Sequence, residues 1–245
     1  MGNKITTKDI AKMIDHSLLR PDMSVNEILE GCRIAKEYDT ATICVKPSEV
    51  DICREALAGT DVLLTTVIGF PHGGATTPSK VFESIDAIER GCKELDMVLN
   101  IGRMVSRDFA YVEQDVKAVC DVAHERGVIV KVILENAYLD AELIEEACKI
   151  CERAGADFVK TSSGYAPSGA TISDLKLMRA TVSEKVSVKA AGGVRSLDQA
   201  LSVRAAGAVR FGATATIAML TEAKKREAEG TLCEADEATE LTTGY

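Results

Sequence analysis

Residues 128–162 read VIVKVILENAYLDAELIEEACKICERAGADFVKTS. Two apolar, β-branched runs, one from Val128 and one from Asp157, flank a segment of helical periodicity that begins near Asp140 and ends near Gly155. Aspartate is a favoured helix N-cap, and glycine commonly ends a helix. Strands that are apolar on both faces and joined by a helix are typical of a parallel sheet. This stretch therefore predicts one parallel strand–helix–strand unit.

The same alternation continues in both directions along the chain. A second capped helix is expected from Ser196 to Gly207. The strand candidates are IDHSLL from Ile14, TICV from Thr42, VLLTTVIGF from Val62, LDMVLNI from Leu95, VIVKVIL from Val128, DFVKTS from Asp157, VSVKAA from Val186 and VRFGA from Val209.

Eight such units predict an α/β protein, a single-domain (β/α)8 TIM barrel over residues 1–227. A doubly wound open sheet is the alternative, but it normally carries a GxGxxG or GxxxxGKS/T loop after its first strand. Neither motif occurs in this sequence. Residues 228–245 are acidic and poor in apolar residues, which predicts a flexible tail.

The charge balance restricts the partners. The 245 residues include 29 Lys and Arg against 38 Asp and Glu, so the formal net charge is −9 at pH 7. We therefore expect neither nucleic acid nor a membrane surface as a partner. The longest apolar stretches, such as Val62 to Phe70, fall well short of the roughly 20 residues of a membrane-spanning helix. The N-terminal stretch MGNKITTKDIAKMID has no secretory pattern, and we expect a cytoplasmic protein.

Cysteines and histidines do not form a metal-binding pattern. Cys148 and Cys151 make a CxxC, but they lie inside a predicted helix without a second such pair. His16 and His72 are expected at strand ends and His124 on a long helix, without ligand spacing between them. We therefore expect no metal and no other cofactor.

One lysine stands among apolar neighbours in each of three successive strands: Lys131, Lys160 and Lys189. A lysine that faced the helix layer would bury its ammonium without water, so the barrel interior or its rim is favoured. Burial and mutual repulsion should lower the pKa of at least one of them, which makes it a nucleophile able to form a Schiff base. The alternative is that all three lie at strand ends and pair with carboxylates such as Asp96 or Glu135.

Asp96 is the best-placed carboxylate to move protons, because its strand directly precedes the three lysine strands. A plain ion pair with Lys131 or Lys189 is the alternative, and both roles are compatible. Asp15 is a second carboxylate on a strand candidate, with an N-cap or loop anchor as its alternative role.

Glycines follow the last strands. Gly192 and Gly193 follow the strand of Lys189, and Gly212 and Thr214 precede the last helix. In (β/α)8 barrels the loops after strands seven and eight often bind phosphate. Gly164 could supply a third segment. An ordinary turn is the alternative, but together with the lysines these glycines predict a phosphorylated aldehyde or sugar as substrate.

The sequence resembles the deoxyribose-phosphate aldolase family across residues 14 to about 216. The motifs that carry the resemblance are Asp15-His-Ser-Leu-Leu, Thr66-Val-Ile-Gly-Phe-Pro-His-Gly73, Glu94-Leu-Asp-Met-Val-Leu-Asn-Ile-Gly102, Val130-Lys-Val-Ile-Leu-Glu135, Asp157-Phe-Val-Lys-Thr-Ser-Ser-Gly164 and Val188-Lys-Ala-Ala-Gly-Gly-Val-Arg195. The resemblance implies a metal-free class I aldolase that reversibly cleaves 2-deoxy-D-ribose 5-phosphate to D-glyceraldehyde 3-phosphate and acetaldehyde. It also implies a role in deoxynucleoside catabolism.

The resemblance assigns roles that the residues alone left open. It implies that Lys160 forms the Schiff base, that Lys189 lowers the pKa of Lys160, and that Asp96 is the acid and base. It places three further residues in the pocket: Asp15, Cys44 and Lys131.

Three features need separate expectations. Many family members read Gly-Thr-Ser-Ser-Gly where this chain has Gly212-Ala-Thr-Ala-Thr216, which leaves Thr214 as the hydroxyl for the phosphate. Tyr165 replaces a lysine of some members. The chain ends in Tyr245, and some members end in a tyrosine that can reach the site. We therefore expect Tyr245 to help proton transfer. Because barrel aldolases are often dimers, we expect a homodimer. A related aldolase for another aldehyde phosphate and an inactive phosphosugar-binding protein are the alternative functions.

Overall fold

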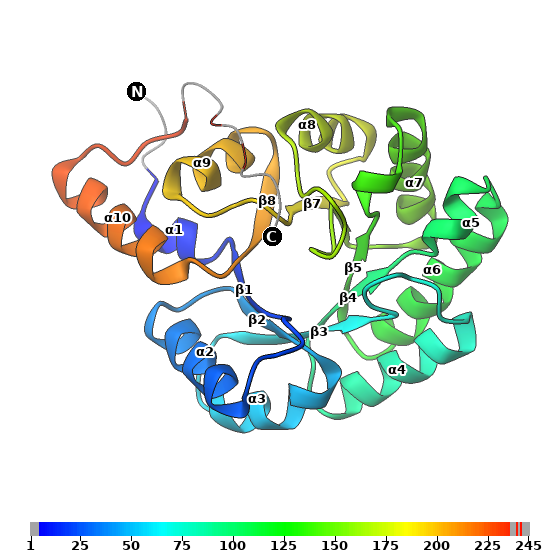
Figure 1. The fold of residues 1–245 in the computed structure, drawn as a ribbon, viewed down its shortest axis with the longest axis horizontal. Helices are drawn as coiled ribbons and strands as arrows, with labels where there is room; N and C mark the ends of the chain where they lie inside the picture. The colour runs from blue at the N-terminus through cyan, green and yellow to red at the C-terminus, as the bar shows by residue number, and fades with distance from the viewer. Residues whose placement is uncertain (1–4, 236–238, 240, 242–245) are drawn as a thin grey trace.

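The computed structural model describes residues 5–235, 239 and 241, and its strands form a closed barrel. All neighbouring strands are parallel, in chain order, and β8 pairs with β1 through Ile14 and Phe211. Figure 1 shows the helices in a ring outside the strands. The (β/α)8 barrel is therefore confirmed. The strands are β1 Ile14–Leu18, β2 Thr42–Val45, β3 Leu63–Ile68, β4 Glu94–Val98, β5 Ile129–Ile133, β6 Phe158–Lys160, β7 Ser187–Ala190 and β8 Ala208–Ala213.

The helices begin and end at the expected kinds of residue. Asp140 caps α7 by accepting from the backbone N–H of Leu143, and Gly155 ends it with φ 92°. Ser196 starts α9 with a capping box that includes Gln199, an arrangement that stabilises a helix by about 1 kcal/mol. The helices are α1 Thr7–Ala11, α2 Val25–Glu37, α3 Val50–Ala56, α4 Thr77–Glu89, α5 Ile101–Val105, α6 Phe109–His124, α7 Ala141–Ala154, α8 Ile172–Thr181, α9 Leu197–Ala205 and α10 Thr216–Glu229, with short 3-10 turns at Pro47–Glu49 and Asn136–Tyr138.

Strand residues alternate between two buried layers. Ile43 and Val45 of β2 belong to the apolar core, whereas Cys44 between them interacts electrostatically with Asp96 and with the lysines of the interior. Successive side chains of a strand point to opposite faces, so the apolar residues pack under the helices and the others fill the barrel. The polar strand residues are thereby brought together in its interior.

A buried ion pair outside the barrel supports the carboxyl end of β4. Lys80 of α4 is fully buried and donates to Asp115 of α6 at 2.6 Å and to the carbonyl of Val98 at 2.9 Å. Its stem leaves no room for a side chain at residue 69, because a Cβ on Gly69 would lie 2.8 Å from Cε of Lys80. This pair joins two helices to the strand that carries Asp96.

The last helix ends at Glu229, two residues beyond the expected end of the barrel domain. Leu232 is buried, Glu234 pairs with Arg204 at 2.9 Å, and the backbone N–H of Thr239 donates to Ser202 at 2.8 Å. The described residues after α10 therefore lie against the barrel. No helix within the described ranges is long and apolar enough to cross a membrane.

Candidate active site

The three lysines and Asp96 meet inside the barrel. Nζ of Lys160 and Nζ of Lys189 each donate to Oδ2 of Asp96 at 2.7 Å, and Nζ of Lys131 donates to Oδ1 at 2.8 Å. Lys160 lies directly opposite Lys189, and Asp96 opposite Lys131, in the strand register. All four residues are buried. The expected convergence of three cations is confirmed, and Asp96 pairs with every one of them.

Asp15 belongs to the same cluster. It lies within β1, fully buried, and forms ion pairs with Lys189, with Lys131 at 3.4 Å and with Arg210 at 2.6 Å. The alternative role as an N-cap or loop anchor is therefore wrong. Burial by itself would raise the pKa of Asp15, but the cations Lys131, Lys189 and Arg210 hold it below its ordinary value.

The cations act on Asp96 in the same way. Burial raises its pKa, but Lys131, Lys160 and Lys189 outweigh burial and hold the pKa well below the usual range. Asp96 is therefore a carboxylate at neutral pH.

Lys160 differs from the expectation that one lysine has a lowered pKa. Burial, the largest influence, and the charge of Lys131 lower its pKa, but Asp96 at 2.7 Å together with Cys44 raises it, and the net direction is upward. The expectation considered repulsion between lysines and did not include a carboxylate shared by all of them. Lys160 must therefore give up its proton against the attraction of Asp96 before the amine can react.

Cys44 contributes a neutral thiol. It is fully buried in β2, and burial together with the charge of Asp96 raises its pKa to about 11. The thiol is therefore protonated at neutral pH and borders the cluster without adding charge.

Two charged residues of the cluster were missed from the sequence. Glu94 of β4 and Arg210 of β8 are joined by an ion pair at 3.0 Å, and Glu94 also pairs with Lys131. The signal for Glu94 is its spacing, since it stands two residues before Asp96 and so faces the same side of the strand. The signal for Arg210 is the one that marked the three lysines, a lone cation among apolar strand neighbours. The structure places it opposite Lys189.

Glu135 does not pair with the lysines. Its carboxylate accepts from the backbone N–H of Ser163 at 3.1 Å and from the Ser163 hydroxyl. The Ser163 hydroxyl oxygen in turn accepts from the backbone N–H of Tyr165 at 3.0 Å. Glu135 has φ 59°, a left-handed backbone conformation that is uncommon for a residue other than glycine. This pair holds the loop that follows Lys160.

A cavity of about 1150 Å³ opens over the carboxyl ends of the strands. Its lining includes the expected phosphate segments, namely Gly164, Gly192, Gly193, Gly212 and Thr214. In the part of the chain that the structure describes, Lys160 is the lysine of the cluster that lines this cavity, whereas Lys131 and Lys189 are fully buried and do not line it. Gly192 and Gly193 have φ of 80° and 93°, which favours glycine, so their backbone approaches the cavity without side chains.

Tyr165 bridges two loops at the cavity. Its hydroxyl donates to the carbonyl of Leu19 at 2.7 Å, and its ring packs edge-on against Phe70 with centroids 5.4 Å apart. It therefore ties the loop after β6 to the loop after β1, where a lysine would have supplied a charge. Tyr245 lies outside the described residues.

His16 lines the cavity, whereas His124, Cys148 and Cys151 lie outside the lysine cluster. His16 lies in the middle of β1 and not at a strand end, and burial lowers its pKa to about 4. His124 contacts Asp157 at 2.9 Å on the outer side of the barrel, and Cys148 and Cys151 are free thiols within α7. Among the described residues, no three His, Cys, Asp or Glu side chains are grouped to hold a metal ion.

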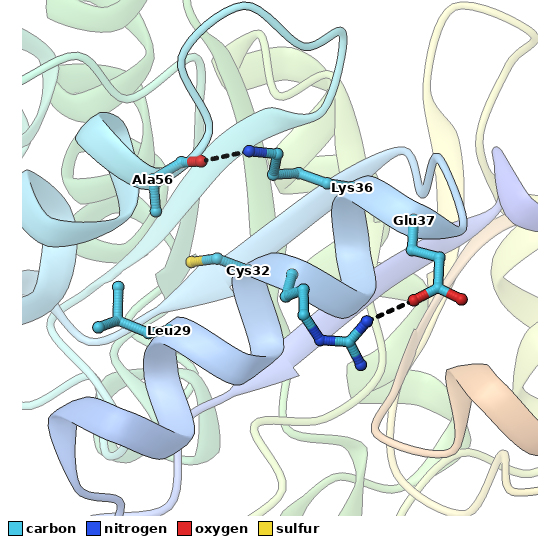
Figure 2. Close-up of a pocket in the computed structure, with 6 residues that line it drawn as sticks. Leu29, Cys32, Lys36, Glu37 and Ala56 are labelled. Atoms are coloured by element: carbon cyan, nitrogen blue, oxygen red, sulfur yellow. Dashed lines mark hydrogen bonds and ion pairs between the residues drawn. The ribbon is translucent and has the colours of Figure 1, made fainter.

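A second, smaller pocket lies on the outer side of α2. Figure 2 shows Leu29, Cys32, Glu37 and Ala56 around it, with Lys36 donating to the carbonyl of Ala56 at 3.0 Å. None of the residues of the lysine cluster lines this pocket. The large cavity is therefore the candidate active site.

Known proteins share both the sequence and the fold. The model of the DeoC/LacD family aldolases matches residues 10–222. A deoxyribose-phosphate aldolase of Thermoanaerobacter sp. (strain X514) is 47% identical over 218 residues, which are 89% of this chain and 98% of the relative. One from Clostridium perfringens (strain 13 / Type A) is 47% identical over 212 residues, 86% of this chain and 94% of the relative.

A solved structure agrees with these relatives. The tetrameric deoxyribose phosphate aldolase from Aeropyrum pernix superposes with a TM-score of 0.83 at 30% identity, over 89% of this chain and 92% of the other. The family match, relatives of nearly the same length and the buried lysine cluster next to the cavity all indicate an aldolase. This chain therefore belongs to the DeoC/LacD family of aldolases.

Proposed function

We propose that this aldolase reversibly cleaves 2-deoxy-D-ribose 5-phosphate to D-glyceraldehyde 3-phosphate and acetaldehyde through a Schiff base on Lys160. One observation carries the choice of lysine: Lys160 lines the cavity and lies 2.7 Å from a buried carboxylate. Relatives that act on deoxyribose phosphate cover nearly the whole chain, which supports this substrate.

The reaction begins when Lys160, after loss of its proton, attacks the aldehyde carbon C1 of the open-chain sugar. The carbinolamine loses water, and the resulting iminium accepts the electron pair of the C2–C3 bond as that bond breaks. The C3 hydroxyl loses its proton and becomes the aldehyde of glyceraldehyde 3-phosphate. The enamine of acetaldehyde remains on Lys160, gains a proton at C2 and is released by hydrolysis.

Asp96 with a water molecule is the proposed base for the C3 hydroxyl and the acid for C2, a role worth roughly 10²- to 10⁴-fold in rate. Its Oδ2 already accepts a hydrogen bond from Nζ of Lys160 at 2.7 Å, so it is within reach of atoms bonded to that nitrogen. Lys189 donates to the same oxygen and competes with Lys160 for it. This competition favours release of the Lys160 proton.

The phosphate end of the substrate is assigned to the glycine loops. Backbone N–H groups at Gly192, Gly193 and Gly212 can approach an anion closely, and Thr214 adds a hydroxyl. The sequence Gly212-Ala-Thr-Ala-Thr216 departs from the common family pattern, so another aldehyde phosphate is the second candidate substrate.

Cell location and assembly belong to this proposal as well. Phosphorylated sugars do not cross a bilayer unaided, because a charged group is costly in hydrocarbon, so the cytoplasm is the expected compartment. The relative from Aeropyrum pernix is a tetramer, and a homodimer is the smallest symmetric assembly of this chain to test.

Borohydride reduction in the presence of acetaldehyde, followed by peptide mass spectrometry, tests the proposal. We expect an ethyl group on Lys160 and none in Lys160→Leu, while Lys117→Leu on the exposed side of α6 serves as the matched control and keeps the adduct. An adduct on Lys131 or Lys189 would move the Schiff base to another lysine. A folded protein that binds the sugar phosphate without any adduct would favour an inactive binding protein.

A further inference from the structure

The lysine cluster contains more cations than carboxylates. Four cations contact three carboxylates in one buried network, so the fully ionised cluster carries one excess positive charge. The cations are Lys131, Lys160, Lys189 and Arg210, and the carboxylates are Asp15, Glu94 and Asp96. An uncompensated buried charge is costly, and the cheapest relief is the loss of one proton.

Arg210 cannot provide that relief. A guanidinium stays protonated in proteins, so the proton must come from a lysine. Arg210 donates to Oδ1 of Asp15 at 2.6 Å and to Oε1 of Glu94 at 3.0 Å, and its side chain is 16% exposed. It thereby contacts one oxygen of Asp15 and both oxygens of Glu94, the second of these at 3.5 Å.

The remaining oxygens are divided unequally among the lysines. Lys131 contacts Asp15, Glu94 and Asp96, and Lys189 contacts Asp15 and Asp96. Lys160 contacts Asp96 alone among the described residues, through an oxygen that it shares with Lys189. It is therefore the lysine with the poorest compensation.

We propose that Arg210 is a positioning residue of the aldolase reaction. Its permanent charge compensates part of the negative charge of Asp15 and Glu94, so Lys189 depends more on Asp96. Lys160, which shares that carboxylate, then becomes the lysine that gives up its proton. The inference rests on the proposed Schiff base at Lys160. Arg210 itself does not line the cavity.

Charge counting predicts opposite effects for two substitutions. Arg210→Met leaves three cations on three carboxylates, so Lys160 should keep its proton to higher pH. Glu94→Gln leaves four cations on two carboxylates, so Lys160 should lose its proton at lower pH. The double variant restores one excess positive charge and should return to the original behaviour.

Charged and titratable groups face Lys160 from several elements. Those of the ion-pair network, or with an electrostatic effect on Lys160, come from β1, β2, β4, β5, the loop after β5, β7 and β8: Asp15, Cys44, Glu94, Asp96, Lys131, Glu135, Lys189 and Arg210. His16 of β1 and Arg195 after β7 line the same cavity and stay unchanged in all variants. Arg210 and Glu94 are the pair to change, because neither contacts Lys160 directly and a shift in its titration then reports charge balance.

The measurement is the rate of ethylation of Lys160 by acetaldehyde and cyanoborohydride from pH 5 to pH 10, read by peptide mass spectrometry. For Arg210→Met we expect about tenfold slower labelling at pH 7, with the pH 7 rate of the unchanged protein reached about one pH unit higher, because one pKa unit is a tenfold change in the neutral amine. Glu94→Gln should label faster at pH 7, and Arg210→Met with Glu94→Gln should follow the original profile. Thermal melts verify that each variant is folded.

A mere structural role predicts a different pattern. It would lower the melting temperature of all three variants and leave the pH midpoint of labelling in place, and that result would overturn the inference. If Arg210→Met does not fold, the downward shift of the pH midpoint of Lys160 labelling in Glu94→Gln still tests the charge balance. Absence of any Lys160 adduct in the unchanged protein would instead refute the Schiff-base proposal, so the two failures are distinguishable.

Discussion

Asp96→Asn should separate Schiff-base formation from turnover. The carboxylate of Asp96 is the strongest influence that holds a proton on Lys160, at 2.7 Å. At an effective dielectric constant of about 20, two unit charges at that separation attract each other by about 6 kcal/mol. We take this energy as the upper limit of what Asp96 contributes to keeping the proton on Lys160. Asparagine removes this attraction while it keeps the shape of the side chain and one carbonyl oxygen.

The pKa of Lys160 should therefore fall. Lys131 and Lys189 lose the same partner, but both keep contacts to Asp15, so the deprotonation falls mainly on Lys160. Because three lysines share the charge of Asp96, we expect only a part of this upper limit to act on Lys160. A shift of at least about one pKa unit then gives at least about tenfold faster labelling of Lys160 at pH 7.

Turnover should change in the opposite direction. Without a carboxylate to move protons at C3 and C2, cleavage should slow by roughly 10²- to 10⁴-fold. The assay compares acetaldehyde labelling at pH 7 with steady-state cleavage of 2-deoxy-D-ribose 5-phosphate, and the double variant Asp96→Asn with Lys160→Leu controls for labelling elsewhere. If Asp96→Asn labels as slowly as the unchanged protein at pH 7, the electrostatic account of Lys160 is wrong.

We expect three further outcomes, one for Lys189, one for the buried Lys80–Asp115 pair and one for Thr214. Lys189→Leu removes the competitor for Oδ2 of Asp96, so Lys160 holds its proton to higher pH and the pH optimum of residual cleavage should move upward; an unchanged or lower optimum would contradict this. Lys80→Met leaves Asp115 buried without its cation and should lower the free energy of unfolding by about 3–5 kcal/mol in urea titrations, with recovery when Asp115→Leu is added. Thr214→Ala should weaken binding of the phosphorylated substrate by about 1.5–3 kcal/mol, seen as a higher KM, while KM for 2-deoxyribose without phosphate stays the same; equal effects on both sugars would remove the phosphate role.

Local pattern was enough to predict the barrel. Each strand is an apolar run whose length and β-branched residues distinguish it from the helices, and Asp140, Gly155 and Ser196 mark helix ends by chemistry that acts within a few residues. The cost of burying an ammonium under the helix layer also predicted the lysines in the barrel interior or at its rim, and the position of Asp96 one strand earlier predicted it as their partner. These features need no knowledge of distant parts of the chain.

The division of charge inside the barrel depended on the tertiary structure. Asp96 and Lys189 are 93 residues apart, and the contact between them exists because the barrel closes with one particular strand register. The same closure brings Arg210 to Asp15 across the β8–β1 seam, which completes a network of four cations and three carboxylates. The sequence by itself therefore predicted that the three lysines and Asp96 face inward but missed Glu94 and Arg210, and only the tertiary structure decided which carboxylate pairs with which cation. That pairing sets the direction of the Lys160 pKa, because electrostatic energy depends on distances that only the folded chain defines.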